Sequence, residues 1–180
     1  MKKPIVTEQT TVSEIGGLVC SSLKSAGIDC FLSGGAVVTI YTQNKYMSYD
    51  LDFVSLGDRN KIKTVMEAIG FIKVPTRHFV HPESKFYVEF PGSAVLIGDQ
   101  PIIEFDEIKT KFGTLKLLTP TDSIKDRLAA FYHWNDKQGL EQAVMIARSH
   151  PVKLDEIKSW SLKEFQKVKF DEFITALKQK

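Results

Sequence analysis

Residues 31–54 constrain the fold of this chain more than any other segment. A short apolar strand runs into a Ser-Gly-Gly turn, a helix-like stretch follows, and a second strand then carries Asp50 and Asp52. Side chains two residues apart on a strand share one face and lie roughly 6.6 Å apart along it. The segment therefore predicts a strand–helix–strand unit with two carboxylates on one face, next to a glycine turn at the start of a helix.

Composition is that of a globular protein. The chain has 180 residues, 43% of them hydrophobic and 26% charged, which predicts one domain or a domain with a helical appendage. Cys20 and Cys30 are expected to be buried free thiols in a reducing compartment, with a disulfide or reactive pair as the alternative. No run reaches the roughly 18 apolar residues of a membrane span, and the N-terminus lacks the apolar region of a signal peptide. We therefore expect a cytoplasmic protein with no membrane partner.

Hydrophobic spacing divides the chain into two parts. Residues 1–118 are predicted to form an α/β (α+β) core, a mixed sheet with flanking helices. Its helices are expected at 11–26, 35–41 and 59–69, and its strands at 30–32, 49–55, 71–74, 85–90, 94–97, 102–109 and 113–118. Residues 119–180 are predicted to form a C-terminal helical bundle, with helices at 120–133, 137–149 and 154–160 and one or two more to the end.

Helix starts are marked by capping residues. Asp58 and Thr119 each precede a helical pattern, and a proline follows Thr119 at the first helical position. Ser161 followed by Glu164 reads as a capping box that opens another helix. The net charge of +2 is too small to indicate nucleic acid. Lysines in residues 153–180 alternate with acids, which favours a solvated helical surface over an RNA-contacting tail.

Asp50 and Asp52 are the first candidate site residues. Mg²⁺ prefers hard oxygen ligands and is typically held by one or two carboxylates together with substrate phosphates. Phosphoryl and nucleotidyl transfer need such an ion to neutralise the triphosphate. A bare Asp-x-Asp also fits a strand whose polar face meets water. The Ser-Gly-Gly turn before it decides for a metal site, with Mg²⁺ expected and Mn²⁺ as the alternative.

The turn itself is a candidate phosphate site. Gly34 and Gly35 let the backbone approach a phosphate, and the free N–H groups at the start of a helix point at it. The hydroxyl of Ser33 can donate to a phosphate oxygen. A tight strand-to-helix turn also needs glycine for steric reasons alone. Ser48 is expected either to cap the strand entry or to touch phosphate.

A third carboxylate is expected on a neighbouring strand, because adjacent strands lie about 4.8 Å apart. Glu89 is the preferred candidate, since its apolar neighbours in the sequence occupy the opposite face. It would serve as a general base for an acceptor hydroxyl and as a metal ligand. Glu104 and Asp106 are the rivals, and the absence of a third acid is the remaining alternative.

Several cations are weighed as ligands of phosphate or of an acidic acceptor. Arg77, His78 and His81 lie before the Glu89 strand, where the alternative is an ordinary surface loop. Lys125 and Lys137 lie in the helical part, where a lysine that projects into the cleft can bind phosphates as a point charge. The alternative for both lysines is a solvated position on an amphipathic helix.

Together, the Ser-Gly-Gly turn, the Ser-x-Asp-x-Asp strand fifteen residues later and a following acidic strand residue resemble the nucleotidyltransferase superfamily, whose fold is like the catalytic domain of DNA polymerase beta. Within it, the chain is similar to AbiEii-type and related small bacterial and archaeal proteins. The resemblance covers about residues 28–149. It implies that Asp50, Asp52 and Glu89 hold the metals, that the turn cradles a triphosphate, and that Lys125 contacts it.

The resemblance implies Mg²⁺-dependent transfer of a nucleoside monophosphate from a nucleoside triphosphate to an acceptor hydroxyl. The acceptor is open between RNA, a protein and a small alcohol. Two alternatives remain: a non-catalytic nucleotide-binding or toxin–antitoxin partner of the same fold, and an adaptor that binds nucleic acid or protein through the helical part. The expected assemblies are a homo-oligomer or a complex with an antitoxin.

Overall fold

The computed structural model of the protein describes residues 5–92 and 95–179. Its helices are α1 (Val12–Ser25), α2 (Gly34–Tyr41), α3 (Arg59–Ala68), α4 (Pro120–Trp134), α5 (Lys137–Ser149), α6 (Leu154–Lys163) and α7 (Lys167–Lys178). Its strands are β1 (Cys30–Ser33), β2 (Asp50–Ser55), β3 (Ile72–Lys73), β4 (His78–Val80), β5 (Tyr87–Glu89), β6 (Leu96–Ile97), β7 (Gln100–Pro101), β8 (Phe105–Thr110) and β9 (Gly113–Leu118).

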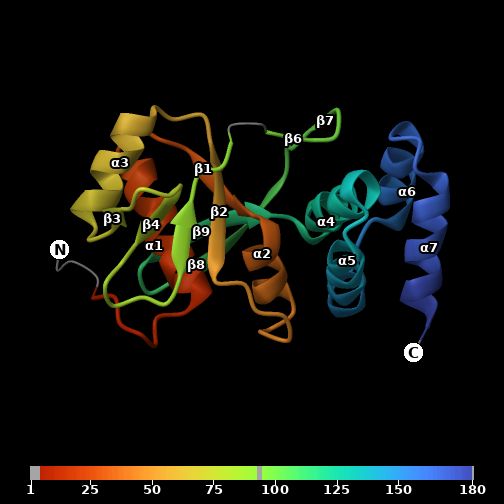
Figure 1. Ribbon diagram of the computed structural model, residues 1–180, viewed down its shortest axis with the longest axis horizontal. Helices are drawn as coiled ribbons and strands as arrows, with labels where there is room; N and C mark the ends of the chain where they lie inside the picture. The colour runs from red at the N-terminus through yellow and green to blue at the C-terminus, as the bar shows by residue number, and fades with distance from the viewer. Residues whose placement is uncertain (1–4, 93–94, 180) are drawn as a thin grey trace.

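Seven strands form one mixed sheet in the order β3-β4-β5-β2-β1-β9-β8. Strand β1 runs antiparallel to β2 and parallel to β9, and β2 runs parallel to β5. Strands β6 and β7 form a separate two-stranded sheet. Figure 1 shows α3 and β3 at one end of the molecule and the helices α4–α7 at the other. The predicted mixed α/β fold is confirmed.

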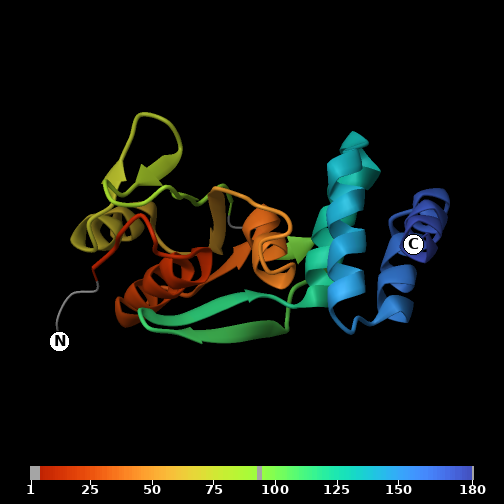
Figure 2. The same cartoon turned by 90° about the horizontal axis from the view of Figure 1, so that it is seen from below.

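The helical part packs directly on the α/β part. Helix α4 begins two residues after β9 ends and contacts α2, α5 and α6, while α5 contacts α2 and α7. Figure 2 shows α4 and α5 next to the α/β part and α6 and α7 outside them. The boundary expected at residue 118 thus coincides with the end of the last strand, although a division into two domains stays a prediction. Within the described residues, no helix combines the length and apolar character needed to cross a membrane.

Helix caps confirm the sequence signals at Asp58 and Thr119, and the structure adds one that was not predicted, at Thr11. Thr11 and Glu14 form a reciprocal capping box at α1, and the side chain of Asp58 accepts from two backbone N–H groups at the start of α3. Thr119 accepts from the third residue of α4, and Pro120 stands at its first position. Each cap satisfies backbone N–H groups that have no partner within the helix.

The capping box expected at Ser161 is wrong. Ser161 lies inside α6, fully buried, and its hydroxyl contacts the Tyr132 hydroxyl at 2.8 Å and the carbonyl of Ile157 at 2.8 Å. Burial against α4 therefore determines its role. Helix α6 continues to Lys163, three residues beyond the predicted end.

Several strand predictions need correction. No strand is predicted at 78–80 or 100–101, where the structure has β4 and β7, because two or three residues are too few to show an alternating pattern. The strand predicted at 102–109 begins at Phe105, as β8. The strand expected at 94–97 is β6, which pairs with β7 and not with the main sheet; residue 94 lies outside the described residues. Cys20 and Cys30 are both buried and unpaired by a disulfide, as expected.

Candidate active site

Strand pairing places three predicted site residues in one row across the sheet. Ser33 at the end of β1 lies opposite Asp52 on β2, and Asp52 lies opposite Glu89 on β5. Asp50 precedes Asp52 by two residues on β2, so both occupy the face away from the buried side chain of Leu51. The sheet therefore brings together the predicted carboxylates and the glycine turn.

The turn packs against a carboxylate with no space for side chains. Gly34 has φ +70°, and a Cβ there would lie 2.6 Å from Asp52 Oδ2. A Cβ on Gly35 would lie 3.2 Å from Ser48 Oγ. Glycine is required at residue 34 for both reasons, since a positive φ is unfavourable for other residues and the added atom would collide. The backbone at the start of α2 therefore lies directly beside the site carboxylate.

Two serines hold this geometry through backbone contacts. Ser33 is the N-cap of α2, but its hydroxyl donates to the Asp52 carbonyl at 3.2 Å and makes no cap hydrogen bond. Ser48 donates to the Asp50 carbonyl at 3.0 Å, and its N–H donates to Thr39 Oγ1 at 2.8 Å. The start of α2 is thus left without a side-chain cap, which suits an anion at its N–H groups.

Electrostatic strain is concentrated on Asp52. Burial, followed by the nearby charges of Glu89 and Asp50, raises its pKa to about 6, while Arg127 acts in the opposite direction. Both causes disfavour the ionised carboxylate. A bound cation would offset them, so this position favours a positively charged ligand.

Glu89 is buried and incompletely satisfied. It is 6% exposed, and its Oε1 has no hydrogen-bond partner among the described residues. Arg77 Nε lies 2.9 Å from that oxygen without hydrogen-bond geometry. His78 Nε2 lies 3.3 Å from Glu89 Oε2 and 3.9 Å from Asp50 Oδ1. A buried carboxylate oxygen without a hydrogen bond is a favourable position for a further ligand.

The histidines before β5 do not lie together in a loop. His78 belongs to β4 and is the register partner of Glu89, so it faces the carboxylates. His81 packs edge-on against Phe71, and burial lowers its pKa. The pairing of β4 with β5 therefore separates the two histidines.

A divalent metal fits the donor set but would require rearrangement. In the part of the chain that the structure describes, no group of three or more His, Cys, Asp or Glu side chains is arranged to hold a metal ion. Asp50, Asp52 and Glu89 nevertheless supply hard oxygen donors on adjacent strands, the raised Asp52 pKa favours a cation, and Glu89 Oε1 lacks a hydrogen bond. These residues are the ones that could hold it.

The rival acids lie elsewhere. Asp106 belongs to β8, the edge strand at the opposite end from β3, and accepts a hydrogen bond from the Tyr41 hydroxyl at 2.8 Å. Glu104 lies before β8 and pairs with Lys153 at 3.0 Å. Neither is on a strand that pairs with β2.

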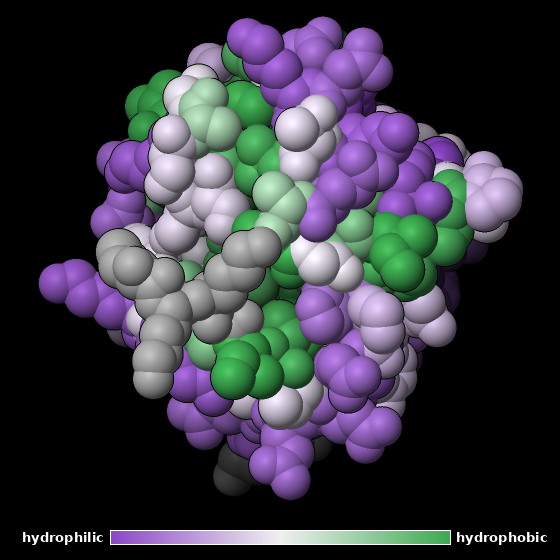
Figure 3. Space-filling model, turned by 90° about the vertical axis from the view of Figure 1, so that its left-hand side faces the viewer, coloured by the Kyte–Doolittle hydropathy of each residue, from purple (hydrophilic) through white to green (hydrophobic). Residues whose placement is uncertain are grey.

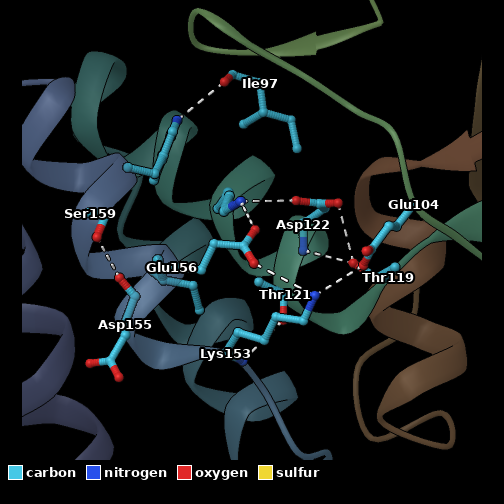
Figure 4. A network of polar contacts seen from close by, with 12 residues as sticks. Ile97, Glu104, Thr119, Thr121, Asp122, Lys153, Asp155, Glu156 and Ser159 are labelled. Atoms are coloured by element: carbon cyan, nitrogen blue, oxygen red, sulfur yellow. Dashed lines mark hydrogen bonds and ion pairs between the residues drawn. The ribbon is translucent and has the colours of Figure 1, made fainter.

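The two predicted lysines are not placed at the carboxylates. Lys125 is 4% exposed, and its Nζ lies 3.2 Å from Asp122 Oδ1 and 2.5 Å from Glu156 Oε1. Asp122 and Glu156 converge in the polar network of Figure 4. Lys137 pairs with Glu172 of α7 at 3.5 Å. Both lysines therefore join helices of the helical part to one another.

Arg127 is the α4 cation that acts on the site, and sequence reasoning did not single it out. Its charge opposes the rise in the Asp52 pKa, and its guanidinium contacts Asp126 at 2.6 Å. At about 100° per residue, Arg127 lies about 200° around the helix from Lys125. Lys125 therefore points away from the carboxylates when Arg127 faces them. The sequence shows that α4 carries a cation on each of two opposite faces. Only the packing of α4 determines which of these faces meets the sheet.

Comparisons with known proteins place the fold. No family model matches the chain, and no curated protein matches it. An antigenic nucleotidyltransferase-like protein from Paracoccidioides brasiliensis is similar in structure, with a TM-score of 0.58, 14% identity and coverage of 79% of this chain and 78% of that one. Two structures of the antibiotic-resistance factor ANT(2'')-Ia, one a solution structure and one a crystal structure in complex with adenylyl-2''-tobramycin, give TM-scores of 0.49 and 0.47 at 14% and 12% identity. They cover 95% and 92% of this chain, and 96% and 97% of theirs. The similarity to the Paracoccidioides brasiliensis protein shows that the chain has a nucleotidyltransferase-like fold.

Proposed function

We propose that the protein is a metal-dependent nucleotidyltransferase that moves a nucleoside monophosphate from a nucleoside triphosphate to an acceptor hydroxyl. The observation that carries the proposal is the row of Ser33, Asp52 and Glu89 across three adjacent strands, with Gly34 directly against the Asp52 carboxylate. This row combines a phosphate-binding helix start with carboxylates that suit a cation.

Each group has a role in the proposed reaction. Asp50, Asp52 and Glu89 would hold Mg²⁺ or Mn²⁺, which would supply charge for the triphosphate and the leaving group. The N–H groups at the start of α2 bind the phosphates. Glu89 accepts the proton of the acceptor hydroxyl. The acceptor oxygen forms a bond to the α-phosphorus as the bond to pyrophosphate breaks, and pyrophosphate leaves.

A non-catalytic nucleotide-binding protein of the same fold, including a partner in a toxin–antitoxin pair, is the second candidate. The contacts of Arg77 and His78 with Glu89 favour it, because they engage the proposed base. Both candidates require nucleotide binding at Asp52, whereas only the first requires release of pyrophosphate. An AbiEii-type relationship would be compatible with either candidate.

Calorimetric titration with each of the four nucleoside triphosphates and Mg²⁺ tests the site. We expect wild-type binding that depends on Mg²⁺ and is lost in the Asp50→Asn/Asp52→Asn variant. A variant without two exposed carboxylates outside the site, Glu107→Gln/Asp155→Asn, should bind as the wild type does. Absence of binding to all four triphosphates in the wild type would overturn the proposal. Pyrophosphate release in the presence of an acceptor then separates the transferase from the non-catalytic protein.

A further inference from the structure

A cavity of about 310 Å³ lies between the start of α3 and the strands β3 and β4. Four cations and two aromatic rings line it, and we call it the basic pocket: Arg59, Lys63, Lys73, Arg77, Phe79 and Phe90. No carboxylate is among its lining residues. Its volume is at the lower end of the range for small-molecule sites. The end of the molecule with α3 and β3 presents hydrophilic side chains around smaller hydrophobic patches (Figure 3).

Among the described residues, two of the four cations of the basic pocket, Arg59 and Lys73, contact backbone carbonyls and no carboxylate. Arg59 donates to the Phe90 carbonyl at 2.6 Å, and Lys73 donates to the Thr76 carbonyl at 3.1 Å. Neither has an ion-pair partner within the described residues. Lys63 pairs with Glu67 at 3.6 Å, where both side chains are about half exposed, so the pair is weak. Like charges close together repel, and a bound anion would offset that repulsion.

Arg77 connects the basic pocket to the candidate active site. It lines the pocket, and its Nε lies 2.9 Å from the buried Glu89 Oε1. Phe90 directly follows Glu89, so its ring is on the opposite face of the chain, and the pocket lies around the end of β5 from the carboxylates. Arg77 therefore lies between the basic pocket and Glu89.

We infer that the basic pocket binds a phosphate group of the acceptor and thereby positions the acceptor hydroxyl at Glu89. This inference rests on the proposed function: it names the chemical class of the acceptor in the proposed reaction. Arginine suits phosphate through paired N–H donors, and lysine binds it as a point charge. The acceptor is then a phosphate ester, carried either by a small sugar-like alcohol or by the end of an oligonucleotide.

Binding of a phosphorylated sugar tests the pocket without any nucleotide. Ribose 5-phosphate and ribose would each be titrated into the full chain, followed by amide NMR, in wild type and in two double variants. Lys63→Gln/Lys73→Gln removes two charges from the pocket, and Lys61→Gln/Lys109→Gln removes two exposed lysines outside it. We expect ribose 5-phosphate, and not ribose, to bind the wild type. Its dissociation constant should rise at least tenfold in the pocket variant and change less than twofold in the other.

Equal binding of the two sugars, no binding of either, or full affinity in the pocket variant would overturn the inference. Failure of the proposed function is separable, because it is read from triphosphate binding, which the pocket variant should retain. Asp50→Asn/Asp52→Asn should lose triphosphate binding and keep ribose 5-phosphate. A 5′-phosphorylated tetranucleotide tests the source of the phosphate. Tenfold tighter binding than the sugar indicates an oligonucleotide end, and similar binding indicates a small alcohol.

Discussion

Replacing Asp52 by asparagine should stabilise the metal-free protein at neutral pH. The folded state raises the pKa of this carboxyl from 3.8 to about 6, mainly through burial and the charges of Glu89 and Asp50. Each pKa unit corresponds to about 1.36 kcal/mol, so ionised Asp52 destabilises the fold by about 3 kcal/mol above pH 6. No described hydrogen bond or ion pair uses the Asp52 carboxylate oxygens. The substitution therefore removes a charge without breaking a contact.

The stability gain from Asp52→Asn should depend on pH in a definite direction. Between pH 3.8 and 6 the folded state holds more protons than the unfolded state at this residue, so its contribution to stability falls as pH rises. The gain in the Asp52→Asn variant should be near zero below pH 4, grow through this interval, and stay constant above about pH 7. Because the new amide N–H groups are half-buried, we expect a net gain of about 1–2 kcal/mol. That corresponds to about 2–8 °C in Tm.

Thermal unfolding in EDTA from pH 4 to 8 measures this gain. Asp155→Asn, an exposed carboxylate in α6, is the matched control and should change stability by less than about 0.5 kcal/mol. Added Mg²⁺ should reverse the order, since a ligand at 100 times its Kd stabilises the wild type by about 2.7 kcal/mol. A loss of stability in the Asp52→Asn variant that is the same at every pH would refute the electrostatic reasoning.

Three further substitutions separate packing from function. Gly34→Ala should lower stability by more than about 1 kcal/mol in urea unfolding and abolish triphosphate binding, because the added Cβ would lie 2.6 Å from Asp52 Oδ2. Gly27→Ala is the control: residue 27 also has a positive φ, of +76°, but no atom lies within 4 Å of an added Cβ, so only the cost of the strained backbone is expected. Lys125→Met should lower stability by about 1–3 kcal/mol, because it leaves Asp122 and Glu156 without their cation. The affinity for triphosphate, measured by calorimetry, should not change, because both carboxylates lie outside the candidate active site. Trp160→Phe should cost about 1–3 kcal/mol in urea, because the buried indole donates to the Ile97 carbonyl at 3.2 Å.

Local chemistry made much of the α/β half predictable from the sequence. The alternation around Asp50 and Asp52 predicted their shared face, and the glycine turn predicted the start of α2. Thr119 with the following proline predicted the start of α4. These signals lie within a few residues of the structure they specify, so tertiary packing did not need to be known.

Longer-range packing was not predictable in the same way. Strand β4 has three residues, and only its pairing with β5 brings His78 to Glu89. Lys125 is the predicted phosphate ligand of α4, yet Arg127, on the opposite side of the helix, is the cation whose charge acts on Asp52. Ser161 had a capping pattern, but burial against Tyr132 placed it inside a helix. In each case a contact between distant segments determined the outcome.

The contacts of Glu89 connect the candidate active site with the basic pocket. Its Oε1 is buried without a hydrogen bond, while Arg77 and His78 approach its two oxygens from β4 and the loop before it. Removal of a cation beside a buried carboxylate leaves the negative charge of the carboxylate less compensated. A metal ion at Asp52 and an anion in the basic pocket would act on this balance from opposite sides, since one attracts Glu89 and the other attracts Arg77. An anion that draws Arg77 away from Glu89 would leave this carboxylate free to accept a proton from an acceptor hydroxyl, so under the proposed function the Arg77 contact would link acceptor binding to the chemistry.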